Sequence, residues 1–169
     1  MKNFVKEWVF PMVGVFILAL LIQRFVFFHV TVPTGSMIPT INEGDRFLVL
    51  REYFPERLET GDVVVFKIWP DGVETLYVKR LIGRPGDTVT IKDGVVSVNG
   101  EVLEEDYVKR PDNFNGEYKV PEGKYFFMGD NRQDSKDSRY PDVGFIDESA
   151  ILARAGLRFW PLNNMGLVK

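Results

Sequence analysis

The longest uninterrupted run of apolar positions lies at the N-terminus of the chain. From Trp8 to Ile22 there are fifteen residues without a charged side chain, and after an interruption that includes Arg24 the apolar residues continue to Phe28. A bilayer core of about 30 Å requires about 20 helical residues. Residues 8–28 meet that length if Arg24 extends its charged head towards the far interface. The pattern therefore predicts one transmembrane helix over residues 8–28.

Two other interpretations share this apolar composition, a cleaved signal peptide and the core helix of a soluble domain. A signal peptide would be followed by a cleavage site of the Ala-x-Ala type, whereas the bulky residues Phe27, Phe28 and His29 follow here. The run from Trp8 to Ile22 has no amphipathic period, and fifteen uninterrupted apolar residues without one are uncommon in the helices of soluble proteins. Both observations favour a retained anchor.

The charges beside this run predict its orientation. Lys2 and Lys6 precede it, and basic residues favour the cytoplasmic side of a membrane. We therefore expect a short cytoplasmic N-terminus at residues 1–7 and an extracytoplasmic domain at residues 29–169.

Beyond residue 29 the hydrophobic pattern becomes that of β-strands. Short runs of β-branched and aromatic residues alternate with turn residues, and Asp93-Gly94 and Asn99-Gly100 are typical of tight hairpin turns. The strands are predicted within residues 46–50, 62–69, 74–82, 88–103, 124–131 and 153–162. Because the connections are mostly short, the pattern predicts a mainly β fold built on an antiparallel sheet.

A small insertion of strands and loops is expected at roughly residues 88–123. Its first part, residues 88–103, contains both turn dipeptides and predicts a three-stranded meander. Its second part, residues 104–123, carries the polar runs EED and PDNFNGE, and it is expected to form a solvated excursion.

Composition narrows the chemistry further. The chain of 169 residues has a net charge of −3, which is not the basic footprint of a nucleic-acid-binding domain. It has no cysteine, so thiol catalysis and thiolate metal sites are excluded. His29 is its single histidine, and a His-based metal site or a Ser-His-Asp triad would depend on that residue alone. No cofactor or metal is expected.

The segment VPTGSMIPT, residues 32–40, contains a candidate nucleophile, Ser36. A serine hydroxyl needs a neighbouring base to accept its proton. His29 is one candidate, although a role at the membrane interface is more usual for a residue in its place. A lysine buried in an apolar strand is the other type of base, because burial lowers its pKa from about 10.4. Lys67 and Lys79 both lie in such strands, and either is equally compatible with an exposed edge strand, so periodicity alone leaves the base open.

The polar segment GDNRQDSKDSR, residues 129–139, follows an apolar strand directly. A solvated surface loop is the simplest interpretation of its composition. A polar network beside the active site is the alternative, in which Asp137 pairs with Arg139 and the Ser135 hydroxyl orients a neighbouring amine.

Several motifs in the same order resemble those of bacterial type I signal peptidases (leader peptidases), which are membrane-anchored proteases with a Ser-Lys dyad. VPTGSMIPT resembles the serine segment of the family, and GDVVVFK and YVKRLIGRPGD resemble its middle motifs. MGDNRQDSKDSR resembles its late motif, and GLRFWPL is similar to its C-terminal strand. The resemblance covers residues ~8 to 165 and implies an antiparallel β catalytic domain tethered by one transmembrane helix.

The resemblance, and not periodicity, selects the catalytic residues. It implies that Ser36 is the nucleophile and Lys79 the general base. It also implies that Thr34 contributes its hydroxyl to an oxyanion hole with the Ser36 N–H, and that Ser135 orients the lysine amine. Asp130, Asp137 and Arg139 match supporting residues of the family.

The resemblance further implies a substrate and a location. The expected reaction is the removal of signal peptides from exported preproteins after small residues at positions −3 and −1, through an acyl-enzyme. The expected partners are preproteins at the translocon exit and the lipid bilayer, with no nucleic acid, at the outer face of the bacterial plasma membrane. The residues expected to bind substrate are Val30, Val32, Met37, Tyr77 and Val78.

Overall fold

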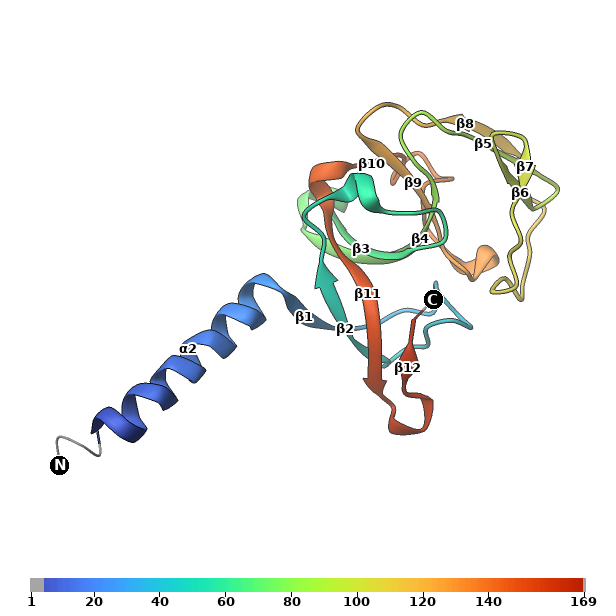
Figure 1. The fold of residues 1–169 in the computed structure, drawn as a ribbon. Coiled ribbons are helices and arrows are strands. Elements are labelled where there is room, and N and C mark those ends of the chain that lie inside the picture. Colours follow the sequence, from blue (N-terminus) through green and yellow to red (C-terminus); the bar gives the residue numbers. More distant parts are fainter. Residues whose placement is uncertain (1–4, 169) are drawn as a thin grey trace.

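The computed structural model describes residues 5–168, which form a long N-terminal helix followed by two antiparallel β-sheets (Figure 1). The cytoplasmic segment expected at residues 1–7 therefore falls partly on residues 1–4, which lie outside the described residues. The described residues begin with a π-helical turn, Val5–Val9, and continue as the α-helix α2, Phe10–Phe25.

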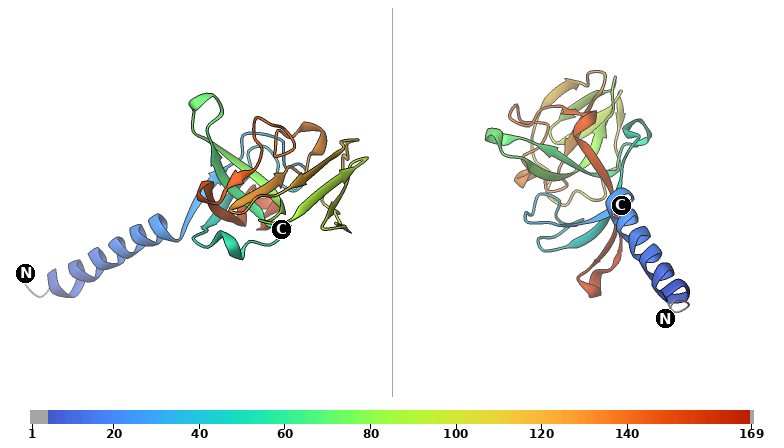
Figure 2. Two further views of the ribbon diagram at one scale, coloured as in Figure 1. Left: turned by 90° about the horizontal axis from the view of Figure 1, so that it is seen from above. Right: turned by 90° about the vertical axis from the view of Figure 1, so that its left-hand side faces the viewer.

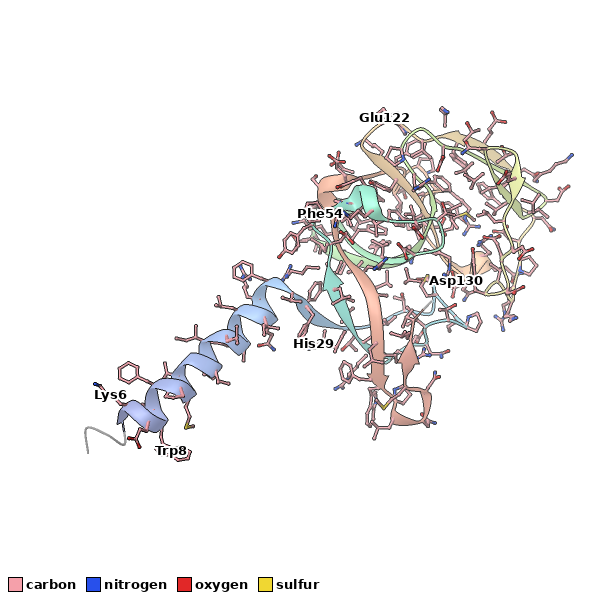
Figure 3. All side chains as sticks on the ribbon, viewed as in Figure 1. Lys6, Trp8, His29, Phe54, Glu122 and Asp130 are labelled. Carbon is pink, nitrogen blue, oxygen red and sulfur yellow. The ribbon has the colours of Figure 1, made fainter. Side chains whose placement is uncertain are left out.

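Helix α2 extends away from the β-sheets in all the views (Figures 1 and 2). None of its side chains is buried, and Lys6 and Trp8 lie near its free end (Figure 3). In the described part of the chain it is the one helix long and apolar enough to cross a membrane, counted as 20 residues from Lys6–Phe25. A core helix of a soluble protein would have its apolar side chains covered, so this interpretation is excluded.

The helix ends at Phe25, three residues before the predicted end of the span. The reason is that Phe27 and Phe28 already belong to strand β1, where they pair with Leu50 and Val49 of the following strand. The sequence pattern could not separate the two, because an apolar strand that directly follows an apolar helix continues the same run.

Hydrogen bonds join the end of this helix to the sheet. The last carbonyls of a helix have no partner within the helix. Here the Arg51 side chain donates from Nε to the Arg24 carbonyl at 2.8 Å, and the Tyr53 hydroxyl donates to the Phe25 carbonyl at 2.8 Å. The Arg51 N–H donates to the Val26 carbonyl at 2.9 Å. The helix is therefore connected to the sheet by more than its covalent link.

The larger sheet confirms the predicted antiparallel β fold. Its strand order is β1-β2-β11-β3-β4-β9-β10, with β12 paired to β11. The strands are β1 (Phe27–Thr31), β2 (Arg46–Arg51), β3 (Val63–Ile68), β4 (Thr75–Gly83), β9 (Lys124–Met128), β10 (Ile146–Asp147), β11 (Ile151–Trp160) and β12 (Gly166–Leu167). Short 3-10 turns lie at Pro55–Arg57, Pro70–Gly72, Arg132–Asp134, Glu148–Ala150 and Leu162–Asn164.

The smaller sheet is the predicted insertion, and its strand order is β7-β6-β5-β8. The strands are β5 (Thr88–Lys92), β6 (Val95–Val98), β7 (Glu101–Val102) and β8 (Gly116–Lys119). The first three form the predicted meander, and its turns have the positive φ angles that the two dipeptides favour, 50° at Asp93 and 52° at Asn99.

The prediction that residues 104–123 are a solvated excursion is correct for most of their side chains, which are exposed or half-buried, but it does not hold for the whole segment. Strand β8 lies within them and pairs with β5, and Glu105 and Asp112 form ion pairs with buried arginines. The polar composition could not reveal that Glu105 and Asp112 face buried arginines rather than water.

Three apolar clusters hold the sheets together. One lies beneath the segment that carries Ser36 and includes Met37, Ile41 and Phe47, none of which is exposed. A second lies within the larger sheet around Phe66 and Phe127. The third is shared by the two sheets and fixes the insertion to the larger sheet; it consists of Ile82, Val89, Ile91, Val96, Val120, Phe126 and Met128.

Candidate active site

Ser36 lies in the loop between β1 and β2. Two antiparallel backbone hydrogen bonds hold the base of this loop, from Val32 N–H to the Asp45 carbonyl and from Gly44 N–H to the Val32 carbonyl. Met37, the residue after Ser36, is fully buried in the core. The backbone on one side of the serine is thus fixed by packing, while Ser36 itself is only half-buried.

Lys79 lies in the middle of β4, which pairs with β3 on one side and with β9 on the other. Its side chain reaches the serine loop, and Lys79 Nζ lies 2.5 Å from Ser36 Oγ. A second polar contact runs from Nζ to the Val78 carbonyl at 3.3 Å. The Tyr77 ring centre is 5.3 Å from the same nitrogen.

The surroundings of Lys79 lower its pKa from 10.5 to about 8. The largest cause is burial, because the lysine is only 4% exposed and its charged form loses hydration. Asp137 and Asp130 act in the opposite direction, and the positive charge of Arg139 adds to the lowering. A sizeable fraction of this amine is therefore neutral close to physiological pH, which a base requires.

The other two candidate bases have different surroundings. The Lys67 side chain is 29% exposed, and its ammonium lies 3.7 Å from the Glu74 carboxylate and 5.0 Å from the Trp69 ring centre. His29 is an exposed residue of β1, near the junction with the helix (Figure 3). Neither residue lines the pocket that contains Ser36.

Residues 129–139, which we call the supporting loop, pack against the serine loop. Asp137 is fully buried and forms hydrogen-bonded contacts with Arg139 at 2.8 and 2.9 Å. The Ser135 hydroxyl donates to Asp137 at 2.7 Å. Within the described residues, Lys79 Nζ is hydrogen-bonded to Ser36 and Val78 and not to Ser135, so the lysine-orienting role of Ser135 stays a prediction. The surface-loop interpretation of this segment is wrong, because most of its side chains are buried.

Asp130, another buried residue of the supporting loop, binds Arg80 of β4 and Thr40 of the loop that carries Ser36. Its carboxylate accepts two hydrogen bonds from Arg80, at 2.9 and 2.7 Å, and one from the Thr40 hydroxyl. Arg80 also donates to the Gly61 carbonyl at 2.7 Å. Asp130, labelled in Figure 3, is the second residue of the supporting loop, which follows β9 directly. Bidentate contacts of this kind fix orientation as well as charge.

Two residues that sequence reasoning missed connect the supporting loop to the nucleophile. The Asn131 backbone N–H donates to the Ser36 carbonyl at 3.1 Å, and the Asn131 side-chain amide donates to the Gly35 carbonyl at 3.1 Å. At Gly129 an added Cβ would lie 2.5 Å from the Ser36 carbonyl oxygen and would overlap Ser135. The motif MGDNRQDSKDSR contains both residues, but a sequence motif does not reveal which backbone atoms they contact.

A pocket of about 450 Å³ opens beside the Ser36–Lys79 pair. Of the residues expected to bind substrate, Val30 does not line it and lies in the apolar cluster below the serine loop. Expected residues that do line it are Val32, Thr34, Ser36, Met37, Tyr77, Val78 and Lys79. Among the described residues, no group of three or more His, Asp or Glu side chains could hold a metal ion.

Comparison with known proteins identifies the family to which this chain belongs. The family model described as "Signal peptidase, peptidase S26" matches residues 5–160. The chain belongs to this signal peptidase family. As a member of it, the chain is a serine endopeptidase.

Several curated relatives match this chain over nearly their whole length. Signal peptidase I of Bacillus licheniformis is 40% identical over 97% of this chain and 93% of its own. Signal peptidase I T of Bacillus subtilis is 38% identical over 99% of this chain and 91% of its own. Signal peptidase IB of Staphylococcus aureus is 35% identical over 96% of this chain and 93% of its own.

Proposed function

We propose that this protein is a membrane-anchored endopeptidase that removes signal peptides from exported preproteins with a Ser36–Lys79 dyad. The observation that carries the proposal is the 2.5 Å separation between Ser36 Oγ and Lys79 Nζ at the edge of an open pocket. It is supported by the relatives that bear the name Signal peptidase I.

In this mechanism Lys79 begins as a neutral amine. It accepts the Ser36 hydroxyl proton while Oγ attacks the carbonyl carbon of the scissile peptide bond. The protonated Lys79 then passes that proton to the leaving amine, and the acyl-enzyme remains on Ser36. A water molecule, deprotonated by the same lysine, hydrolyses the ester and frees Ser36. The lowered pKa of Lys79 supports this role, because the base must be neutral before each attack.

The oxyanion that forms during attack requires hydrogen-bond donors. We assign this role to the Ser36 N–H and the Thr34 hydroxyl. Thr34 is exposed and lines the same pocket as Ser36. Within residues 5–168 the Ser36 N–H has no hydrogen-bond partner in the protein, which leaves it available for substrate. One such donor contributes about 3–4 kcal/mol to the transition state.

Specificity for small residues at positions −3 and −1 follows from the apolar walls beside the dyad. Val32, Met37, Tyr77 and Val78 line the pocket, and we assign to them the contacts with the substrate side chains. Val30 acts on this surface indirectly, since it packs beneath Val32 and Met37 in the same cluster. Shallow apolar walls accept alanine and exclude bulk, as Ala-x-Ala cleavage sites require.

The anchor places this chemistry at a membrane. We propose that the helix up to Phe25 spans the bacterial plasma membrane once, with the N-terminus in the cytoplasm and residues 29–169 on the outer face. Lys6 at the free end supports that orientation. The hydrogen bonds from Arg51 and Tyr53 to the end of the helix would keep Ser36 near the bilayer surface, where preproteins leave the translocon.

The test is cleavage of a purified preprotein by the full-length protein in detergent, followed by sequencing of the new N-terminus. We expect one cut after an Ala-x-Ala site in the wild type and none in Ser36→Ala. Thr34→Val removes the proposed oxyanion hydroxyl at similar volume, and it should lower kcat by about 10²-fold. Cleavage by Ser36→Ala at the wild-type rate would contradict the proposal.

A further inference from the structure

The connection between β7 and β8, residues 103–115, lies against the supporting loop. We call these residues the strap. In Figure 1 the strap passes beside the short 3-10 turn that follows β9, and the Gln133 side chain donates to the Pro111 carbonyl at 2.8 Å. The strap lies outside the motifs that suggested the catalytic residues, and the proposed mechanism assigns it no role.

The first contact of the strap is made by Glu105. Its carboxylate accepts hydrogen bonds from both terminal nitrogens of Arg132, and the Tyr107 hydroxyl donates to it at 2.9 Å. Arg132 is fully buried, and it donates from Nε to the Gly129 carbonyl at 3.1 Å. Gly129 is the residue whose backbone lies against Ser36 and Ser135. Two residues, Arg132 and Gly129, therefore connect Glu105 to the nucleophile.

The second contact is made by Asp112. Its carboxylate pairs with Arg139, whose side chain is fully buried. Arg139 also binds the Asp137 carboxylate, and Asp137 accepts hydrogen bonds from Ser135 Oγ at 2.7 Å and from the Gly129 N–H at 2.9 Å. Glu105 and Asp112 are thus both connected to Gly129, the first through Arg132 and the second through Arg139 and Asp137.

A third contact involves an aromatic ring. The guanidinium of Arg80 lies 3.8 Å from the centre of the Tyr107 ring. The same guanidinium is hydrogen-bonded to Asp130, whose negative charge acts on Lys79. Cation–π contacts of this kind are strongest when they are removed from water, and Arg80 is only 2% exposed.

These contacts pair the buried charges of the site. Asp130 binds Arg80 and Asp137 binds Arg139, whereas among the described residues the carboxylate that binds the buried Arg132 is that of Glu105. A buried charge without a partner is unfavourable. The carboxylates of Glu105 and Asp112 supply what the supporting loop lacks. Without them the arginines would draw water into the region beneath Lys79.

We propose that Glu105 and Asp112 are positioning residues, and that the strap holds the supporting loop closed and dry against the Ser36–Lys79 pair. The insertion would then be a part of the catalytic apparatus rather than an appendage. This proposal rests on the proposed function, since it concerns the base of that reaction.

The pH profile separates positioning from a general structural role. Burial is the largest cause of the lowered pKa of Lys79, so a supporting loop that opens to water should raise that pKa. Lys79 acts when neutral, and the acid limb of kcat/KM would then move to higher pH. The polar and charged groups that contact Lys79, act on its charge or line its pocket are unchanged in the strap variants; they are Ser36, Glu43, Tyr77, Asp130, Asp134, Lys136, Asp137 and Arg139.

The experiment uses the full-length protein in detergent with a synthetic preprotein. Glu105→Gln, Asp112→Asn and the double variant keep side-chain volume and remove charge, and Glu104→Gln is the matched control at a neighbouring exposed position. We expect kcat at pH 7 to fall about tenfold in each single variant and further in the double variant, because a buried charge loses its hydrogen-bonded partner. KM should stay within about twofold, and the acid limb should move to higher pH. Glu105→Asp retains the charge and should recover part of the loss.

Each result has one interpretation. Glu104→Gln should match the wild type in both readouts. A double variant with the wild-type kcat and pH profile would overturn the strap proposal, and so would a lower kcat with an unmoved acid limb or a change in KM alone. If the double variant does not fold, the single variants decide by the same criteria. Ser36→Ala, measured in parallel, tests the proposed function separately, because only its continued cleavage would contradict the dyad.

Discussion

Two lysines on the paired strands β3 and β4 differ sharply in their exposure and in the groups that they contact. Lys67 lies near the hairpin end of β3, where its side chain is 29% exposed and pairs with the exposed Glu74. Lys79 lies in the middle of β4, where it is 4% exposed and contacts Ser36. Both lysines lie in runs of β-branched and aromatic residues. Their chemistry differs because their depth in the protein differs.

The difference in depth comes from what covers each lysine. The hairpin end is open to solvent, and Trp69 beside Lys67 is itself 52% exposed. The middle of β4 is covered by the serine loop and by the supporting loop, whose residues Asp130 and Asp137 are buried. A strand pattern fixes the face on which a side chain lies, whereas its pKa depends on the loops that close over that face.

The largest expected effect is the loss of kcat when the proposed base, Lys79, is removed. Lys79→Ala should lower kcat for preprotein cleavage by about 10⁴-fold or more, the scale seen when a protease loses its nucleophile or base. Lys67→Ala is the matched control, and its kcat should stay within about twofold of the wild type because Lys67 contacts neither Ser36 nor the pocket. Steady-state cleavage in detergent measures both. Equal losses of kcat in the two variants would show that burial beside Ser36 does not determine which lysine acts as the base.

The next effect tests the cover over Lys79. Gly129→Ala introduces a Cβ that would overlap Ser135 and lie 2.5 Å from the Ser36 carbonyl oxygen. The supporting loop must shift to make room, and a displacement of this size should lower kcat by about 10²-fold. Gly166→Ala is the control, since no atom lies within 4 Å of the position of its Cβ. If Gly129→Ala cleaves preprotein as fast as Gly166→Ala, the loop does not hold the serine.

A smaller effect concerns stability. The lowered pKa of Lys79 means that the unfolded chain binds a proton that the folded chain releases between about pH 8 and 10.5. Stability should therefore rise with pH across that window, and the folded state carries a penalty below it. Lys79→Met removes the penalty and should raise the free energy of unfolding at pH 7 by up to about 3 kcal/mol.

Urea unfolding of Lys79→Met and Lys67→Met at pH 7 and at pH 10 checks this prediction. The gain in Lys79→Met should shrink at the higher pH, and Lys67→Met should show no such gain. A loss of stability in Lys79→Met at pH 7 would mean that the amine is held in its charged form.

The smallest expected effect is at the hairpin end. Glu74→Gln removes the partner of Lys67, and exposed pairs of this kind contribute only about 0–1 kcal/mol. The melting temperature and kcat should both remain close to those of the wild type. Thermal denaturation and preprotein cleavage measure the two quantities. A marked loss in either would show that the exposed Lys67–Glu74 pair contributes more to stability or activity than its exposure suggests.

Much of the fold could be predicted because the pattern within each strand is local. The runs that became β2, β3, β4, β9 and β11 alternate or are continuously apolar, and the turns at Asp93 and Asn99 carry their own signal. The start of β1 was missed because Phe27 continues the apolar run of the helix. Strand β8 was missed because its sequence, GEYK, is polar, and its pairing with β5 depends on residues that precede it by nearly thirty positions.

The site was less accessible to sequence reasoning, and the reason is again distance along the chain. Burial could suggest a lysine base, but the choice of Lys79 over Lys67 came from a family resemblance. The contacts of Glu105 with Arg132 and of Asp112 with Arg139 each join residues 27 positions apart. No periodicity marks such pairs, and the polar composition of the strap indicated solvent instead.

The most direct test of the Ser36–Lys79 dyad is the rate at which a serine-reactive β-lactam-type inhibitor acylates the protein, followed by mass spectrometry from about pH 6 to about pH 11. We predict a label on Ser36, with a rate that rises through a midpoint near pH 8 in the wild type and in Lys67→Ala. In Lys79→Ala the same step should disappear and the rate should collapse. A label on another residue, or an unchanged step in Lys79→Ala, would contradict the account.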